Sequence, residues 1–126
     1  MISLIIKFYK AFKNSWYGFQ SAWCYQWAFR VELGILLLAV PCAFYLGKNA
    51  TEHALLISSV ILLPMAELFN SAVETIIDRI GLEYHELSGR AKDLASAAMV
   101  VAGINILVTW GLILYERINA LFLQAS

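Results

Sequence analysis

The sequence predicts an all-α membrane protein, in which an amphipathic surface helix precedes three membrane-spanning helices. The composition is 61% hydrophobic and only 14% charged, with a mean hydropathy of +0.71, so a soluble domain of 126 residues could not bury its apolar surface. Apolar segments also recur along the chain at lengths near the roughly 20 residues that a span requires. A chain this short is expected to form one domain, residues 1–126.

Residues 3–23 are predicted to form the surface helix. Large apolar side chains recur at steps of three and four residues, at Ile5, Phe8, Phe12, Trp16, Phe19 and Trp23. Lysines at positions 7, 10 and 13 lie between them. This pattern is typical of a helix in the membrane interface, and packing against other protein is the alternative.

Three segments are predicted to span the membrane. The first covers about 28–47, where the stem of Arg30 extends an uncharged stretch and Pro41 is expected to introduce a kink. The second covers about 54–79, and the third, 95–115, carries no charge. The intervening residues 81–90 contain two glycines and a serine and are predicted to form a loop, with the next helix beginning at Arg90.

The basic residues predict the orientation of the chain. With three spans, seven of the nine Lys and Arg residues fall on one side, and Lys48 and Arg117 fall on the other. The positive-inside rule then places the N-terminus and the 81–93 segment in the cytoplasm.

Four polar residues within the second span indicate a function. Glu67, Asn70, Glu74 and Asp78 fall on one arc of roughly 80° if the segment is helical. If the span begins near Ala54 at the outer side, Glu67 lies about 20 Å across a hydrocarbon core of about 30 Å, and Glu74 lies at its inner boundary. Carboxylates at membrane depth are costly and are seldom present without a task.

A row of polar groups from lipid depth to the cytosol suits a reaction between a lipid and a soluble partner. Glu67, half removed from water, is suited to act as a general base near neutral pH, and Glu74 is placed to hold a divalent cation. Lys92 and Asp93 lie at the same level, where a lysine can neutralise a phosphate and an aspartate can orient a metal-bound water. The alternatives are a polar seam that joins neighbouring helices and, for Lys92, a snorkelling side chain.

Two stretches, ELFNSAVETIIDRIG (67–81) and EYHELSGRAKDLASAA (83–98), closely resemble the small integral-membrane diacylglycerol kinases of Gram-negative bacteria. The resemblance covers about residues 7–115. It implies a multi-pass homotrimer in the bacterial inner membrane, with cytoplasmic active sites shared between subunits. It also implies transfer of the ATP γ-phosphoryl group, with Mg²⁺, to the primary hydroxyl of diacylglycerol. No standard nucleotide-binding loop is present, and no nucleic acid partner is expected.

The resemblance implies roles for individual residues. Glu67 would be the general base, Asn70 would help to position it, and Glu74 would bind the magnesium ion. The nucleotide and its metal would contact Lys7, Asn14, Gln26, Glu74, Glu83, Tyr84, His85, Lys92 and Asp93. The lipid site would be lined by Ala28, Phe29, Arg30, Val31, Glu32, His53, Glu67, Ser96 and Trp110.

One position departs from the family pattern. The family has a second metal-binding glutamate where this chain has Gln26. Glu32 is not expected to replace it, because on one helix it would lie six residues on and about 120° away. A two-carboxylate metal site is therefore in doubt. Two other functions stay open: an undecaprenol kinase of the same family, and a non-catalytic membrane assembly protein.

Overall fold

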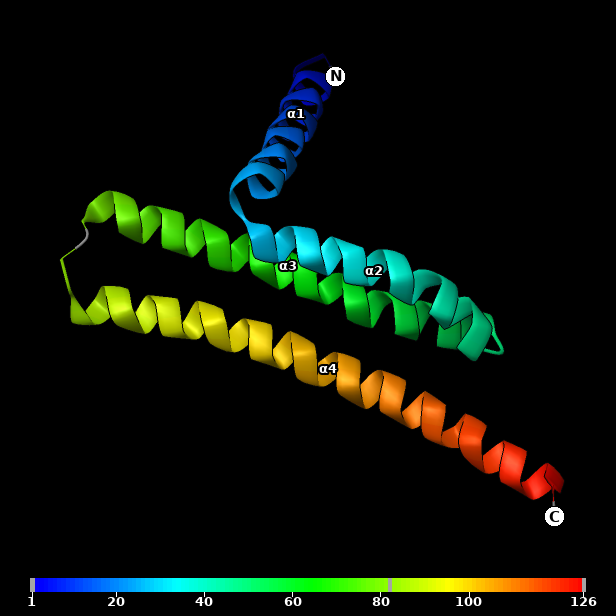
Figure 1. Cartoon of the computed structure of the whole chain (residues 1–126). Coiled ribbons are helices and arrows are strands. Elements are labelled where there is room, and N and C mark those ends of the chain that lie inside the picture. The colour runs from blue at the N-terminus through cyan, green and yellow to red at the C-terminus, as the bar shows by residue number, and fades with distance from the viewer. Residues whose placement is uncertain (1, 82, 126) are drawn as a thin grey trace.

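The described part of the chain is helical throughout apart from short connections (Figure 1). The computed structural model describes residues 2–81 and 83–125, which form four helices and no strand. The helices are α1 (Ile2–Tyr25), α2 (Trp27–Leu46), α3 (Ala50–Ile80) and α4 (Glu86–Ala125). The predicted all-α class is confirmed. Residues 1, 82 and 126 lie outside the described residues, including one position of the expected 81–90 loop.

Helices α2, α3 and α4 are each long and apolar enough to cross a membrane. They run side by side in alternating directions, and α1 leaves this bundle at an angle (Figure 1). Helix α2 matches the expected 28–47 segment to within one residue at each end, whereas α3 and α4 extend beyond the expected 54–79 and 95–115 segments at both ends.

The predicted 81–90 loop is wrong over its second half, because α4 begins at Glu86. His85 stabilises this start: its Nδ1 accepts a hydrogen bond from the Leu87 backbone N–H at 3.2 Å, and its carbonyl accepts one from Gly89 at 3.0 Å. The first bond satisfies a backbone N–H that the first turn of a helix otherwise leaves unpaired, and the second is the first bond of the helical ladder. They offset the cost of about 1 kcal/mol for a glycine inside a helix.

Gln26 alone separates α1 from α2. Its backbone is extended, with φ −110° and ψ 105°, so the helical ladder is interrupted at this residue. Two contacts fix the angle between the helices. Arg30 Nη1 donates to the Trp23 carbonyl at 3.2 Å, and the Phe19 and Phe29 rings stack with their centroids 6.4 Å apart.

Polar contacts join α4 to the turn between α2 and α3. Asn49 caps α3 by accepting a hydrogen bond from the Glu52 backbone N–H at 2.9 Å. The Glu52 carboxylate accepts bonds from the Lys48 backbone N–H and the Asn49 amide and forms an ion pair with Arg117 of α4. Arg117 Nε also donates to the Leu46 carbonyl at 2.9 Å. The half-buried Arg117 therefore ties the far part of α4 to the other two spans.

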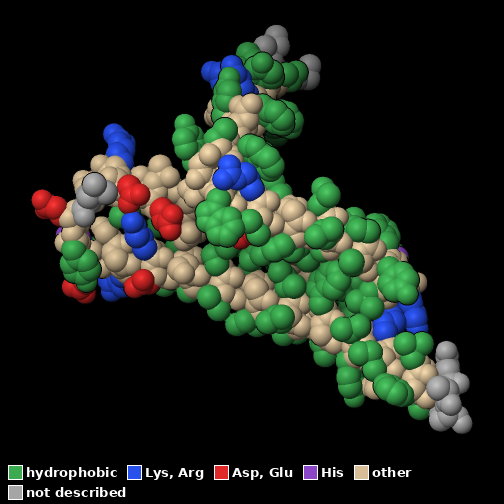
Figure 2. Space-filling view, in the orientation of Figure 1, with side chains coloured by type: hydrophobic (Ala, Val, Ile, Leu, Met, Phe, Trp, Pro, Cys, Tyr) green, Lys and Arg blue, Asp and Glu red, His purple; other side chains and the backbone are tan. Residues whose placement is uncertain are grey.

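The apolar core is small and lies near the same end of the bundle. Ala43, Leu56 and Ile113 are its buried members, and Leu46, Ile57 and Trp110 pack against them. Most other large apolar side chains are exposed, and they cover much of the bundle surface in Figure 2. A surface of this kind is suited to contact with lipid or with other protein.

Arg117→Ala should lower the melting temperature of the protein, because it removes the cation paired with the Glu52 carboxylate and the donor to the Leu46 carbonyl. Thermal unfolding in detergent, followed by circular dichroism, measures the effect. Lys48→Ala is the matched control, because it removes an exposed cation from the same end. Equal melting temperatures for the two variants would show that the Arg117 ion pair does not hold α4 in place.

Candidate active site

Glu67 lies on α3 with only 6% of its surface exposed. Its Oε1 accepts a hydrogen bond from the Ser71 hydroxyl at 3.2 Å, one turn further along the helix. Among the described residues no hydrogen bond reaches the other carboxyl oxygen, Oε2. The carboxyl group is thus held at one oxygen, and the second oxygen is available to a substrate.

A second buried carboxyl group, that of Glu32, comes from α2. Glu32 is 7% exposed, and its Oε2 is buried with no hydrogen-bond partner in the described part of the chain. The group lies close enough to Glu67 for the two carboxyls to interact electrostatically. The buried Glu32 Oε2 needs a proton or a hydrogen-bond donor that the described residues do not supply. The sequence analysis placed Glu32 in the lipid site but did not foresee this proximity.

The polar row continues on α3 with Asn70 and Glu74. The Asn70 amide nitrogen donates to Glu74 Oε1 at 3.3 Å, and the pair is half-buried. The family resemblance implied that Asn70 helps to position Glu67. In the structure, the donor to Glu67 is instead Ser71, which the sequence analysis missed. The spacing of four residues between Glu67 and Ser71 could have revealed it.

Charged residues gather where α3 ends and α4 begins (Figure 2). Lys92 Nζ lies 2.9 Å from Asp78 Oδ1, and Glu74 lies close enough to act electrostatically on the same lysine. A cleft of about 180 Å³ opens here, lined by Ile77, Asp78, Gly81, Glu83, Tyr84, His85, Ser88, Gly89 and Lys92. The structure therefore brings together four of the residues expected to contact the nucleotide, and Asp93 follows Lys92 on α4.

A larger groove, of about 850 Å³, lies between α1 and α3. Its walls are formed by Ser15, Gly18, Phe19, Ser21, Tyr25, Gln26, Leu68, Ser71, Ala72, Thr75 and Ile76. Ser71 connects this groove to the buried Glu67 through the hydrogen bond between them. A ligand in the groove would therefore lie close to the one hydrogen-bond donor of Glu67.

Gln26 and Glu74 do not form a ready-made metal site in one protomer. The described residues contain no group of three or more His, Cys, Asp or Glu placed to hold a metal ion. Gln26 lines the α1–α3 groove, whereas Glu74 contacts Asn70. One carboxylate and neutral amide oxygens suit a Mg²⁺ ion that keeps phosphate oxygens and water among its ligands.

The predicted separation of about 120° between Gln26 and Glu32 rested on a wrong assumption. The prediction assumed one continuous helix, but Gln26 is extended and precedes the first residue of α2. The 120° separation therefore has no meaning here. In the structure Glu32 is buried on α2 and close enough to Glu67 for the two carboxyls to interact electrostatically.

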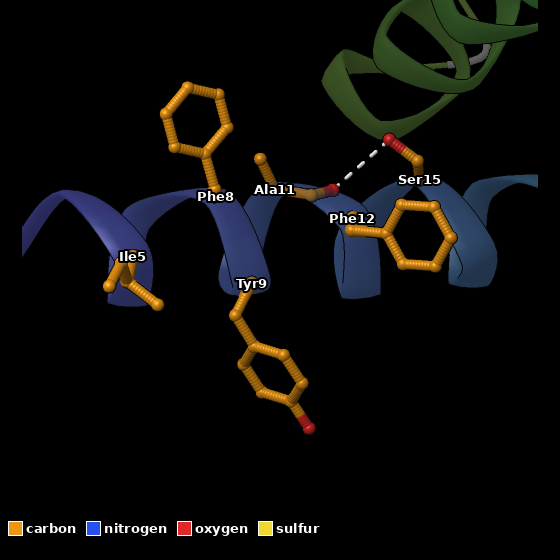
Figure 3. Close-up of a pocket in the computed structure, with 6 residues that line it drawn as sticks. All are labelled: Ile5, Phe8, Tyr9, Ala11, Phe12 and Ser15. Carbon is orange, nitrogen blue, oxygen red and sulfur yellow. Dashed lines mark hydrogen bonds between the residues drawn. The ribbon is translucent and has the colours of Figure 1, made fainter.

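Helix α1 carries Lys7 and Asn14 on an exposed surface, away from the bundle (Figure 1). Figure 3 shows the depression along this helix, which Ile5, Phe8, Tyr9, Ala11, Phe12 and Ser15 line. The Ser15 hydroxyl donates to the Ala11 carbonyl at 3.0 Å, so its proton is not available for a hydrogen bond to a ligand. This surface suits lipid better than nucleotide. Lys7 and Asn14 are not among the residues that line the groove beside Ser71 or the cleft at Lys92.

The residues expected to line the lipid site are spread along the whole span. Ala28 to Glu32 occupy the first turns of α2, where Phe29 and Glu32 are buried, and Ser96 is exposed on α4. His53 lies at the other end, with Nε2 3.0 Å from the Gly47 carbonyl oxygen. It precedes Glu67 by 14 residues on α3, which is about 21 Å.

Trp110 also lies at that far end, where its indole nitrogen donates to the Leu56 carbonyl at 3.3 Å. It packs against the small apolar core. Neither His53 nor Trp110 is close to the buried carboxyls of Glu32 and Glu67. The expected lipid site is therefore not a single cavity of one protomer.

Known proteins with similar sequences identify the family. A family model described as prokaryotic diacylglycerol kinase matches residues 13–114. The diacylglycerol kinase of Escherichia coli K12 is 49% identical over 108 residues, which cover 86% of this chain and 88% of the relative. That of Haemophilus influenzae is 48% identical over 103 residues, covering 82% and 87%. The chain belongs to the prokaryotic diacylglycerol kinase family.

Proposed function

We propose that this protein transfers the γ-phosphoryl group of ATP to the primary hydroxyl of diacylglycerol, forming phosphatidic acid and ADP. The observation that carries the proposal is the buried Glu67 carboxyl, with one oxygen bonded to Ser71 and the other free. Membership of the diacylglycerol kinase family supports the same reaction.

In the proposed reaction, Glu67 Oε2 accepts the proton of the lipid hydroxyl. The hydroxyl oxygen forms a bond to the γ-phosphorus, the bond from that phosphorus to the β,γ-bridging oxygen breaks, and ADP leaves. Such transfers depend on positioning and charge neutralisation more than on covalent chemistry. Lys92 would exchange its exposed partner Asp78 for a phosphate oxygen.

Glu74 is proposed to hold Mg²⁺ together with the ATP phosphates, with Gln26 offering at most a neutral oxygen. The ion would neutralise charge on the β- and γ-phosphate oxygens when bound. Nucleotide contacts are proposed for the cleft that holds Tyr84 and His85, because a nucleoside needs a partly open cleft next to the phosphate-binding lysine.

A homotrimer with shared sites is proposed as the working assembly. The large exposed apolar surface of the bundle supports association with other copies. So does the absence of Lys7 and Asn14 from the described residues that line the groove and the cleft, since residues of a second copy could complete the site. The protein is proposed to lie in the bacterial inner membrane with its N-terminus cytoplasmic and α1 in the interface.

The test is transfer of labelled phosphate from ATP to lipid by the purified protein in mixed micelles, with and without Mg²⁺. We expect labelled phosphatidic acid, formed only when the metal is present. Competition between diacylglycerol and undecaprenol tests the lipid substrate. Preferential labelling of undecaprenol would reassign the substrate, and absence of transfer to either lipid would favour the non-catalytic alternative.

Gln26→Glu should lower the Mg²⁺ concentration needed for half-maximal rate, because it adds a charged oxygen ligand near the phosphates. Lipid selectivity should stay unchanged. A magnesium titration of the initial rate measures the effect, and Gln20→Glu is the control, since it adds the same charge on α1, six residues before Gln26. Loss of activity in Gln26→Glu would mean that the site is built around the neutral side chain.

A further inference from the structure

We infer that Ser71 is a positioning residue, whose hydroxyl holds the Glu67 carboxyl group in the orientation needed to accept the proton of the lipid. The inference deepens the proposed function and rests on it, because Glu67 is assigned there as the base. It concerns a residue that the sequence analysis passed over.

The contact between the two residues is local and shielded from water. Ser71 Oγ donates to Glu67 Oε1 at 3.2 Å, and the two residues are 8% and 6% exposed. Their spacing of four residues places them on the same face of α3. A serine hydroxyl has one proton, and here that proton is committed to the carboxyl group.

The polar side chains next to Ser71 on α3 already have partners of their own. The Asn70 amide donates to Glu74, and the Thr75 hydroxyl donates to the Ser71 carbonyl at 2.8 Å. Glu32, the other polar group near Glu67, is a carboxyl with an unpartnered oxygen. Loss of the Ser71 hydroxyl would therefore leave the Glu67 carboxyl free to turn about its side-chain torsions.

The orientation of the carboxyl group that accepts a proton has a large effect on the rate of the reaction. The hydrogen bond holds Oε1 and thereby leaves Oε2 for the substrate hydroxyl. Because Ser71 also lines the groove between α1 and α3, the hydroxyl lies between this groove and the base. A displacement of about 1 Å in a reacting group can reduce a rate by about 100-fold.

The experiment compares three variants of the full-length protein in the lipid kinase assay. Ser71→Ala should lower kcat by about 10- to 100-fold, with the KM values for ATP and lipid changed less than about 2-fold. Ser71→Thr, which keeps the hydroxyl, should retain most of the wild-type kcat. Ser59→Ala is the matched control, because Ser59 is equally buried on α3 but donates to the Leu56 carbonyl; its kcat should be unchanged.

Three results would overturn the inference: an unchanged kcat in Ser71→Ala, a Ser71→Thr variant as slow as Ser71→Ala, or an equal loss in Ser59→Ala. A lower melting temperature of Ser71→Ala together with raised KM values would assign the serine a structural role instead. Failure of the proposed function is distinguishable, because the wild type would then show no lipid phosphorylation. An active wild type with an inactive Glu67→Gln and a fully active Ser71→Ala would overturn the positioning role alone.

Discussion

Glu67→Gln should reduce lipid phosphorylation by about 10²- to 10⁴-fold, the usual contribution of a general base. An amide cannot accept the proton of the lipid hydroxyl at neutral pH. The substitution preserves the shape of the side chain, and a glutamine oxygen can still accept the hydrogen bond from Ser71. Assembly and nucleotide binding should therefore remain close to those of the wild type, measured by size-exclusion chromatography and by ATP titration.

Glu116→Gln provides the control for loss of a carboxylate. Glu116 lies on α4 with its side chain 71% exposed, and its charge is 3.9 Å from Arg117. Its removal should leave the rate of phosphoryl transfer unchanged. Comparable turnover in Glu67→Gln and the wild type would remove Glu67 from the mechanism.

Glu74→Gln should raise the Mg²⁺ concentration required for half-maximal rate by about 10-fold or more. Removing a residue that hydrogen-bonds to a metal ligand commonly reduces metal affinity by about 10- to 100-fold. Removing the ligand itself should reduce the affinity at least as much. The effect should be large in this chain, because Gln26 provides no second carboxylate. Initial rates measured against free Mg²⁺ at fixed ATP give the shift.

Asp78→Asn separates metal binding from the general effect of negative charge at this end of the bundle. Asp78 is on the same arc of α3 but is paired with Lys92 rather than with Asn70. Its loss should affect ATP affinity more than the magnesium requirement. Identical magnesium titrations for Glu74→Gln and Asp78→Asn would show that Glu74 is not a metal ligand.

The helices and the polar row on α3 could be predicted because they depend on local patterns. Apolar length indicated the spans, and helical spacing placed Glu67, Asn70, Glu74 and Asp78 on one arc. Local signals also failed in places. Gly89 suggested a loop, but the cap provided by His85 lets α4 begin earlier.

Contacts between distant segments could not be predicted in the same way. The proximity of Glu32 to Glu67 depends on how α2 packs on α3, and no spacing within one helix reports it. The pairing of Glu52 with Arg117 joins residues 65 positions apart. Ser71 differs, because its contact with Glu67 is local and its four-residue spacing could have predicted it, but a serine in a helix is commonly bonded to the backbone and gives no signal of its own.

The joint between α1 and α2 has a consequence for insertions and deletions. Gln26 is the only non-helical residue between the two helices, so the connection is too short to accommodate a change in chain length without moving α1. One residue added to the last turn of α1 would rotate everything before it by about 100° and shift it by about 1.5 Å. If α1 lies in the membrane interface as proposed, its aromatic face would then turn away from the interface and its lysines toward it. Length variation among functional relatives is therefore expected before α1 or after α4, and not at this joint.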